Sequence, residues 1–195
     1  MIQKYPWLRV PDWEHSWKGK KYEITFLDDP YYISLWGDVP KGWTNIFGHM
    51  MCDEIEKALE NTGIQNKVYV EEAKEKYGGL RLYMTANTEA HHIISIYECI
   101  SENICCKCGR PHSPMLQLGW ISPYCQKCFN EKMASHYTKP YEEFAPKDKK
   151  NWRIPNELVW THFSKDGDTK EVEDISERVR NIERLWNEKH PDDMV

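Results

Sequence analysis

Two pairs of cysteines constrain this chain more than any other feature of its sequence. Cys105 and Cys108 are separated by two residues, as are Cys125 and Cys128, and sixteen residues lie between the pairs. A tight turn across C-x2-C lets both sulfurs face one ion, and two such turns complete a tetrahedron. Gly109, directly after the first pair, permits the positive φ that such turns often need. The sequence therefore predicts one zinc ion per chain, bound by these four cysteines.

The alternatives for this site are few. The same spacing also suits a rubredoxin-like iron centre, but zinc is the ion we expect. Cys106 makes a poorer pair with Cys108, because only one residue separates them, so Cys105 is taken as the ligand and Cys106 as its neighbour. Four thiolates leave no position for water, which indicates a structural site rather than a catalytic one. Their formal charge with Zn²⁺ is −2, and the basic residues beside the ligands that can offset it are Lys107, Arg110 and Lys127.

Charge and composition narrow the class of protein. The 195 residues carry 26 Lys and Arg against 31 Asp and Glu, a net charge of −5, which argues against a general nucleic-acid coat. The exception is residues 105–139, with five basic residues and one acidic residue. We find neither an apolar run of membrane-spanning length nor a signal peptide, so we expect a cytoplasmic protein whose cysteines stay reduced.

The spacing of apolar residues predicts an α+β fold with a small antiparallel sheet packed on helices. Alternation over 67–85 indicates a β-hairpin, and steps of three and four residues indicate helices on either side of it. The helices are expected over 44–62, 88–103 and 169–190. Shorter extended segments are expected at 22–27, 31–36, 152–154 and 158–163. The predicted organisation is an α+β domain at 1–104 with an aromatic-rich N-terminal segment, a zinc ribbon at 105–139, and a C-terminal extension at 140–195 that ends in a helix.

Local signals refine these elements. Gly63 suits a left-handed cap after the first helix, and Thr88 is the expected N-cap of the second. His91 and His92 lie on that second helix about 100° apart, which favours two surface residues over two metal ligands. Cys52 is expected to be a small buried hydrophobe.

The hairpin and the last helix have predicted faces. The hairpin turn is expected at Tyr77, Gly78 and Gly79, with Arg81 and Tyr83 on a solvated face. The helix at 169–190 has a short heptad-like seam, which we expect to dock on the protein's own core and which is too short to specify an oligomer. The seam residues are Val172, Ile175, Val179, Ile182 and Trp186, with Leu185 widening the seam.

The loop between the cysteine pairs, residues 110–124, is unusually apolar. Such a loop is either a contact surface or a segment folded back on the helix at 88–103. The candidate partner-binding residues are Met115, Leu118, Trp120, Lys107, Arg110 and Lys127.

Four segments occur in a characteristic order: KGWTNIFGHMMCDEIEKAL, KEKYGGLRLY, YECISENICCKCGRP and GWISPYCQKC. Together they resemble a group of small, uncharacterised zinc-ribbon proteins encoded by tailed phages and prophages. The resemblance covers roughly residues 1–133, and residues 134–195 form an extension. It implies a phage accessory gene expressed in the host cytoplasm, and it implies no reaction.

Three functions fit these observations. The favoured one is a non-enzymatic protein that binds a host or defence-system protein, for which an anti-CRISPR inhibitor is one concrete form. The second is nucleic-acid binding or transcription modulation. In this case Trp120 and Tyr124 would stack on bases. The phosphates would be contacted by the basic residues Lys107, Arg110, Lys127, Lys132 and Lys139. The third is an HNH-like nuclease, since His112 lies between the cysteine pairs. No second His or Asn-His set follows it where a catalytic metal would need one, and the chain has no Gly-rich phosphate loop, G-x-S-x-G or H-E-x-x-H motif.

Overall fold

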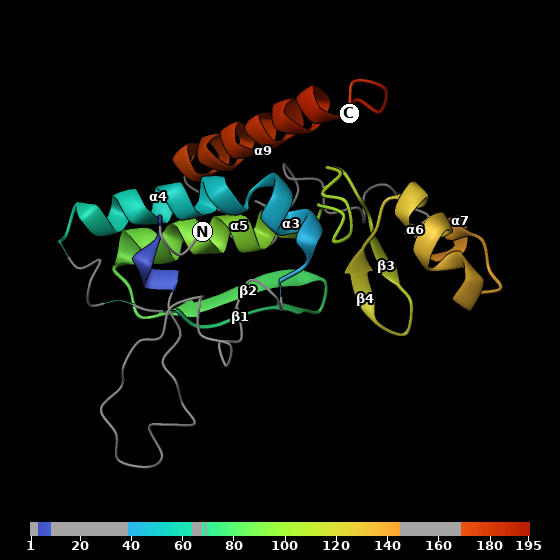
Figure 1. The fold of residues 1–195 in the computed structure, drawn as a ribbon, viewed down its shortest axis with the longest axis horizontal. Coiled ribbons are helices and arrows are strands. Elements are labelled where there is room, and N and C mark those ends of the chain that lie inside the picture. The colour runs from blue at the N-terminus through green and yellow to red at the C-terminus, as the bar shows by residue number, and fades with distance from the viewer. Residues whose placement is uncertain (1–3, 9–38, 64–67, 69, 145–168) are drawn as a thin grey trace, which may run out of the picture.

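The computed structural model describes residues 4–8, 39–63, 68, 70–144 and 169–195, and these form an α+β fold (Figure 1). The helices are η1 (Pro6–Leu8), α3 (Lys41–Ile46), α4 (Gly48–Glu60), α5 (Thr88–Ser101), α6 (Gln126–Lys132), η2 (Ala134–His136), α7 (Tyr141–Phe144) and α9 (Thr169–Lys189). The strands form two antiparallel pairs, β1 (Val70–Lys76) with β2 (Gly79–Met84) and β3 (Met115–Gln117) with β4 (Ile121–Pro123). The predicted fold class is confirmed. The extended segments expected at 22–27, 31–36, 152–154 and 158–163 lie outside the described residues.

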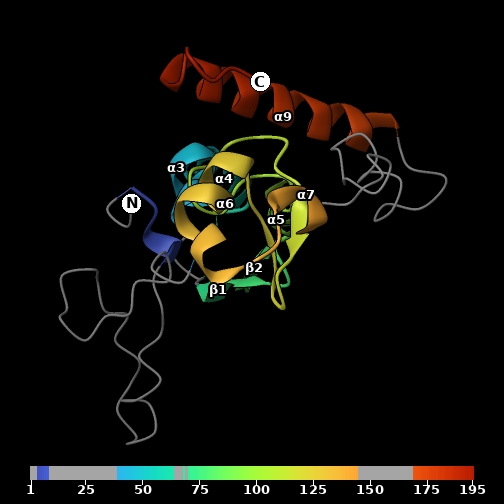
Figure 2. The same cartoon turned by 90° about the vertical axis from the view of Figure 1, so that its right-hand side faces the viewer.

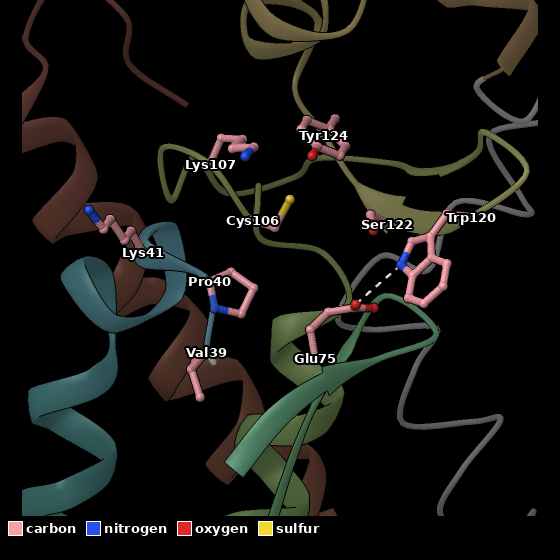
Figure 3. Close-up of a pocket in the computed structure, with 9 residues that line it drawn as sticks. All are labelled: Val39, Pro40, Lys41, Glu75, Cys106, Lys107, Trp120, Ser122 and Tyr124. Atoms are coloured by element: carbon pink, nitrogen blue, oxygen red, sulfur yellow. Dashed lines mark hydrogen bonds between the residues drawn. The ribbon is translucent and has the colours of Figure 1, made fainter. Parts of the chain in front are cut away.

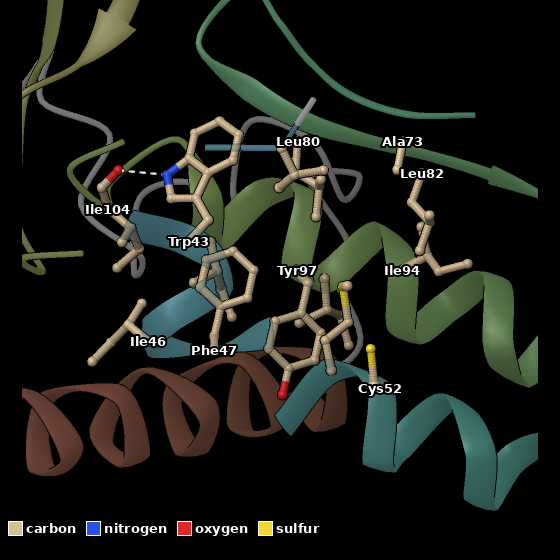
Figure 4. Packing of buried hydrophobic residues seen from close by; sticks show 14 of the residues in the cluster. Trp43, Ile46, Phe47, Cys52, Ala73, Leu80, Leu82, Ile94, Tyr97 and Ile104 are labelled. Atoms are coloured by element: carbon tan, nitrogen blue, oxygen red, sulfur yellow. Dashed lines mark hydrogen bonds between the residues drawn. The ribbon is translucent and has the colours of Figure 1, made fainter. Parts of the chain in front are cut away.

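The elements outside the ribbon form three layers. The β1–β2 hairpin packs on one side of α5, α4 lies beside α5, and α9 covers these helices from the opposite side (Figures 1 and 2). Buried apolar side chains from the hairpin and from all these helices meet in the middle (Figure 4). Cys52 is fully buried among them on α4, as predicted for a small hydrophobe.

The β1–β2 hairpin confirms the predicted alternation. Lys76 pairs with Gly79, so Tyr77 and Gly78 alone form the turn, with φ values of 54° and 81°. Two successive positive φ values define the tight turn that matches the twist of a hairpin. Leu80, Leu82 and Met84 are buried, whereas Tyr83 is exposed as predicted. Arg81, predicted on the same solvated face, is instead partly buried, and its guanidinium lies 3.7 Å from the Glu102 carboxylate.

The single helix predicted over 44–62 is wrong in one respect, because the structure contains two helices that meet at Phe47. Phe47 has a φ of −125°, which breaks the helical path. The two helices have different neighbours. The amide of Gly42 at the start of α3 donates a hydrogen bond to the carbonyl of Cys106 at 3.1 Å, whereas α4 packs against α5. Helix α3 also begins at Lys41, three residues before the start that the sequence predicts.

The cap of α5 differs from the prediction by one residue. Asn87, not Thr88, is the N-cap, and its side-chain oxygen accepts a hydrogen bond from the Ala90 amide at 2.8 Å. Asn87 has the extended backbone that an N-cap requires, which places Thr88 inside the first turn. At the end of α4, Gly63 has the predicted left-handed φ, at 65°.

Helix α9 docks on the protein's own core, as its seam predicts. Ile175, Ile182 and Trp186 are almost fully buried, while the side chain of Val172 lies outside the described residues. Arg178 adds a polar anchor, because its guanidinium donates to the Glu54 carboxylate of α4 through both Nε and Nη2. No helix among the described residues is both long enough and apolar enough to cross a membrane.

Candidate metal centre

The four predicted cysteines come together in space. The sulfurs of Cys105, Cys108, Cys125 and Cys128 all lie within 4.8 Å of one another, and those of Cys108 and Cys125 are 3.7 Å apart. The first pair lies in the loop after α5, and the second lies where β4 leads into α6. Together they are able to hold one metal ion.

The first cysteine turn is closed by backbone hydrogen bonds. The carbonyl of Cys105 accepts from the Gly109 amide at 2.9 Å, and the Cys105 amide donates to the Arg110 carbonyl at 2.9 Å. Gly109 has a φ of 88°, a conformation that side-chain-bearing residues rarely adopt. The glycine that the sequence places there is therefore what allows the chain to reverse around the sulfurs.

The second turn has no glycine and forms by helix capping instead. Cys125 is the N-cap of α6, and its sulfur accepts a hydrogen bond from the Cys128 amide at 3.4 Å. Cys128 lies in the first turn of α6, so both sulfurs sit at the positive end of the helix dipole. A sequence signal for this was present, since CQKCFNEK places a capping residue before a run that favours helix.

Cys106 lies outside the group of four sulfurs. It is buried on the other side of the loop, near Tyr124, and burial raises the pKa of its thiol to about 12. Its sulfur points into a separate cleft (Figure 3). Cys105 is therefore the residue that joins the group, and Cys106 is its neighbour.

The electrostatics of the four thiols favour a bound cation. Hydrogen bonds from Cys108, Cys125 and Cys128 lower the pKa of Cys105 far below its usual range. The same hydrogen bonds to Cys105 raise the pKa values of Cys108 and Cys128, because a second thiolate would face the first at close range. A divalent ion among the sulfurs would offset this repulsion and favour the ionised form of all four.

The metal centre is joined to the helices by buried hydrogen bonds. The indole of Trp43 on α3 donates to the carbonyl of Ile104 at 2.7 Å, immediately before the first ligand (Figure 4). The Cys106 amide donates to the Pro123 carbonyl at 3.0 Å, which joins the first cysteine turn to β4. The positions of the sulfurs are thus set by the surrounding fold.

The basic residues near the ligands have different roles. Arg110 donates to the carboxylate of Asp193 at 3.2 Å, and His112 is hydrogen-bonded to Glu183 at 2.7 Å. Both contacts connect the ribbon to the C-terminal part of the chain. Lys107 and Lys127 are exposed.

The apolar loop at 110–124 divides between core and surface. Leu116 is fully buried and Leu118 is 8% exposed, so Leu118, a candidate partner-binding residue, belongs to the part of the loop that folds back into the core. Met115 is partly buried, next to the hairpin turn at Gly78. Trp120 remains 65% exposed and Ile121 38% exposed.

Two cavities flank the metal centre. One, of about 450 Å³, lies between Cys108, Cys125 and Cys128 on one side and the end of α9 on the other. The second is the cleft that contains the Cys106 sulfur, and Trp120 stands at its edge (Figure 3). Trp120, Tyr124 and Lys107 were already candidates from the sequence, whereas Val39, Pro40, Lys41, Glu75 and Ser122 were missed, because the cleft is built from four separate segments.

A scan against protein-family models and searches of curated proteins and of solved structures find no match to this chain. Its function is therefore inferred from the chemistry of its own residues.

Proposed function

We propose that this chain is a non-enzymatic phage accessory protein that binds a host or defence-system protein, with one structural Zn²⁺ shaping the ribbon that carries the contact surface. An anti-defence inhibitor of the anti-CRISPR type is one concrete form of this proposal. The observation that carries the structural, non-catalytic role is the group of four thiols, all supplied by the protein and all within 4.8 Å of one another. The phage origin rests on the resemblance of four sequence segments to phage and prophage proteins.

Zinc suits this donor set. Four thiolates at about 2.3 Å from a tetrahedral Zn²⁺ lie about 3.8 Å from each other. The sulfurs of Cys108 and Cys125 are already 3.7 Å apart. When four protein sulfurs fill the tetrahedron, no coordination position remains for water or substrate, which supports a structural role.

The charges around the ribbon favour a protein partner over a nucleic acid. Of the five basic residues in the ribbon segment, Arg110 is paired with Asp193 and Lys139 with Glu143. These pairs reduce the positive charge available to phosphates, in a chain whose net charge is already −5. The nuclease alternative also loses support, since His112 contacts Glu183 rather than the group of sulfurs.

Affinity capture from the lysate of infected host cells, with and without nuclease, tests this function. The expected result is a specific protein partner that is retained after nuclease treatment and lost with the Cys125→Ser variant, whose ribbon cannot hold the metal. Recovery of nucleic acid alone would support the second function instead. Cys106→Ser is the matched control, because Cys106 lies one residue from a ligand but outside the group of four.

A further inference from the structure

We propose that the cleft beside Trp120 is the contact site for this partner, and that it takes an acidic protein segment carrying a bulky apolar side chain. This inference rests on the proposed function and names the surface and the partner chemistry. The cleft has a volume of about 620 Å³, a size suited to a few side chains.

The walls of the cleft come from parts of the chain that are distant in sequence (Figure 3). The segment that leads into α3 provides Val39, Pro40 and Lys41, and the first cysteine turn provides Cys106 and Lys107. The ribbon provides Trp120, Ser122 and Tyr124, and the end of β1 provides Glu75. Because Cys106 follows the ligand Cys105 and Tyr124 precedes the ligand Cys125, a metal that fixes the sulfurs also fixes two walls of the cleft.

Trp120 is both exposed and held in one orientation. Its indole Nε1 donates to the Glu75 carboxylate at 3.2 Å, and the other oxygen of that carboxylate accepts from the Gly78 amide at 2.5 Å. An exposed Trp whose polar edge is already bonded offers a large apolar surface with little conformational entropy to lose on binding. Such residues are enriched among those that contribute most to protein–protein affinity.

The exposed apolar surface continues from Trp120 over the tips of the two hairpins. A Cβ placed on Gly78 would lie 3.2 Å from the Ile121 carbonyl, which shows how closely the tips approach. Tyr77 beside that glycine is 71% exposed, and Ile121 is 38% exposed. Large exposed side chains gathered at one place are typical of an interaction site.

The charges of the cleft select the class of partner. Lys41 and Lys107 are exposed on its walls, and neither has an ion pair within the described part of the chain. Glu75 is already bonded to two donors, so the lysines are the charges left for a partner, and they complement Asp or Glu side chains. A long polyanion would fit less well, because β1 leads away from the cleft with exposed Glu71 and Glu72.

The test is selection of peptides from a random-sequence display library on the zinc-loaded full chain. The expected peptides combine Asp or Glu with an aromatic or large aliphatic residue. Binding of a fluorescein-labelled synthetic copy should weaken about 30-fold with Trp120→Ala. It should weaken about tenfold with Lys107→Glu. The matched controls are Tyr83→Ala and Lys132→Glu, which remove an exposed aromatic and reverse an exposed lysine outside the cleft, and both should bind normally.

Several results would overturn the inference. The inference fails if the selection yields no binding peptide, or if the selected peptides lack acidic residues. It also fails if peptide affinity is unchanged by both Trp120→Ala and Lys107→Glu. A single-stranded oligothymidine that binds with the same sensitivity to Trp120→Ala and Lys107→Glu, while acidic peptides do not bind, would assign the cleft to nucleic acid. If wild-type protein and the Trp120→Ala variant capture the same nuclease-resistant partner equally well, the cleft is not the contact site, while the proposed function stands. If wild type captures no such partner, the proposed function itself fails.

Discussion

The helical body and the ribbon are stabilised in different ways. The helical body comprises residues 39–63, 68, 70–104 and 169–195, and its interior is packed with large aliphatic and aromatic side chains. The ribbon together with the short helices that follow it, residues 105–144, has two strands of three residues each and the short helices α6, η2 and α7, with four cysteines at its centre. Its largest fully buried side chain, Phe129, contacts Tyr137, Tyr141 and Phe144 at its outer end.

This difference indicates that the two regions depend on different sources of free energy. The helical body buries enough apolar surface to fold by the hydrophobic effect. Strands of three residues and a helix of two turns are too short to be stable alone, so we expect the ribbon to depend on the metal ion that its four cysteines could hold. The boundary between them is the stretch where α3 contacts the first cysteine turn.

The largest expected effect comes from breaking the metal centre. Cys125→Ser should release zinc and unfold the ribbon, because metal binding in such sites contributes on the order of 10 kcal/mol to local folding. The serine hydroxyl can still cap α6, so loss of the cap does not account for the result. The zinc content measured by elemental analysis should fall from one ion per chain to none. Amide hydrogen exchange should rise across 105–144 while α4 and α5 stay protected.

Cys106→Ser is again the matched control and should retain one zinc per chain. Native protein that contains no zinc, or Cys125→Ser protein that keeps it, would refute the metal assignment. Loss of protection in α4 and α5 together with the ribbon would show that the two regions fold as one unit.

The second largest effect should come from the interior of the helical body. Ile96 on α5 is fully buried, and Ile96→Ala should lower the free energy of unfolding by about 2–5 kcal/mol. Urea unfolding followed by circular dichroism measures the loss, and elemental analysis should still find one zinc per chain. Ser95→Ala, at the adjacent exposed position, should have little effect. Zinc loss from folded Ile96→Ala protein would contradict independent stabilisation of the two regions.

A smaller effect is expected at the boundary. A Cβ on Gly42 would lie 2.3 Å from the Cys105 carbonyl and 2.6 Å from the Gly109 amide, and both groups are backbone. Gly42→Ala should therefore push α3 away from the cysteine turn and cost about 1–3 kcal/mol. Zinc affinity, measured by competition with a chromogenic chelator, should weaken as well. Asn45→Ala on the exposed side of α3 is the control, and equal behaviour of the two variants would show that the boundary adapts without strain.

The sequence predicted the parts of this structure that depend on local spacing. The cysteine pairs, the hairpin and the stripes on α5 and α9 all follow from periods of two to four residues. The break at Phe47 was not predictable in this way, because α3 and α4 contact segments that are distant in sequence, as in the hydrogen bond between residues 42 and 106. The ion pair of Arg110 with Asp193 and the cleft beside Trp120 likewise join segments far apart in sequence. The burial of Leu118 also could not be predicted, because it depends on contacts with residues distant in sequence.

The smallest expected effect distinguishes how acid acts on the two regions. Burial alone would raise the pKa of Asp53 on α4, but hydrogen bonds from Lys4 at 2.6 Å and Tyr5 at 2.7 Å outweigh it and lower that pKa below its usual value. A carboxyl group with a lowered pKa stabilises the folded state above its unfolded pKa of about 3.9, and this contribution is lost as the pH falls through the folded pKa. The side chains of Lys4 and Asp53 are mostly exposed, so the contribution is small. Asp53→Asn should be slightly less stable than wild type at pH 7, and the difference should shrink towards zero below about pH 4. Acid also protonates the cysteine thiolates and releases zinc, but it does so equally in both proteins, so the effect cancels in their difference. Urea unfolding of the helical body at stepped pH measures this difference, and a gap that stays constant down to pH 3 would show that the Asp53 charge does not contribute to stability.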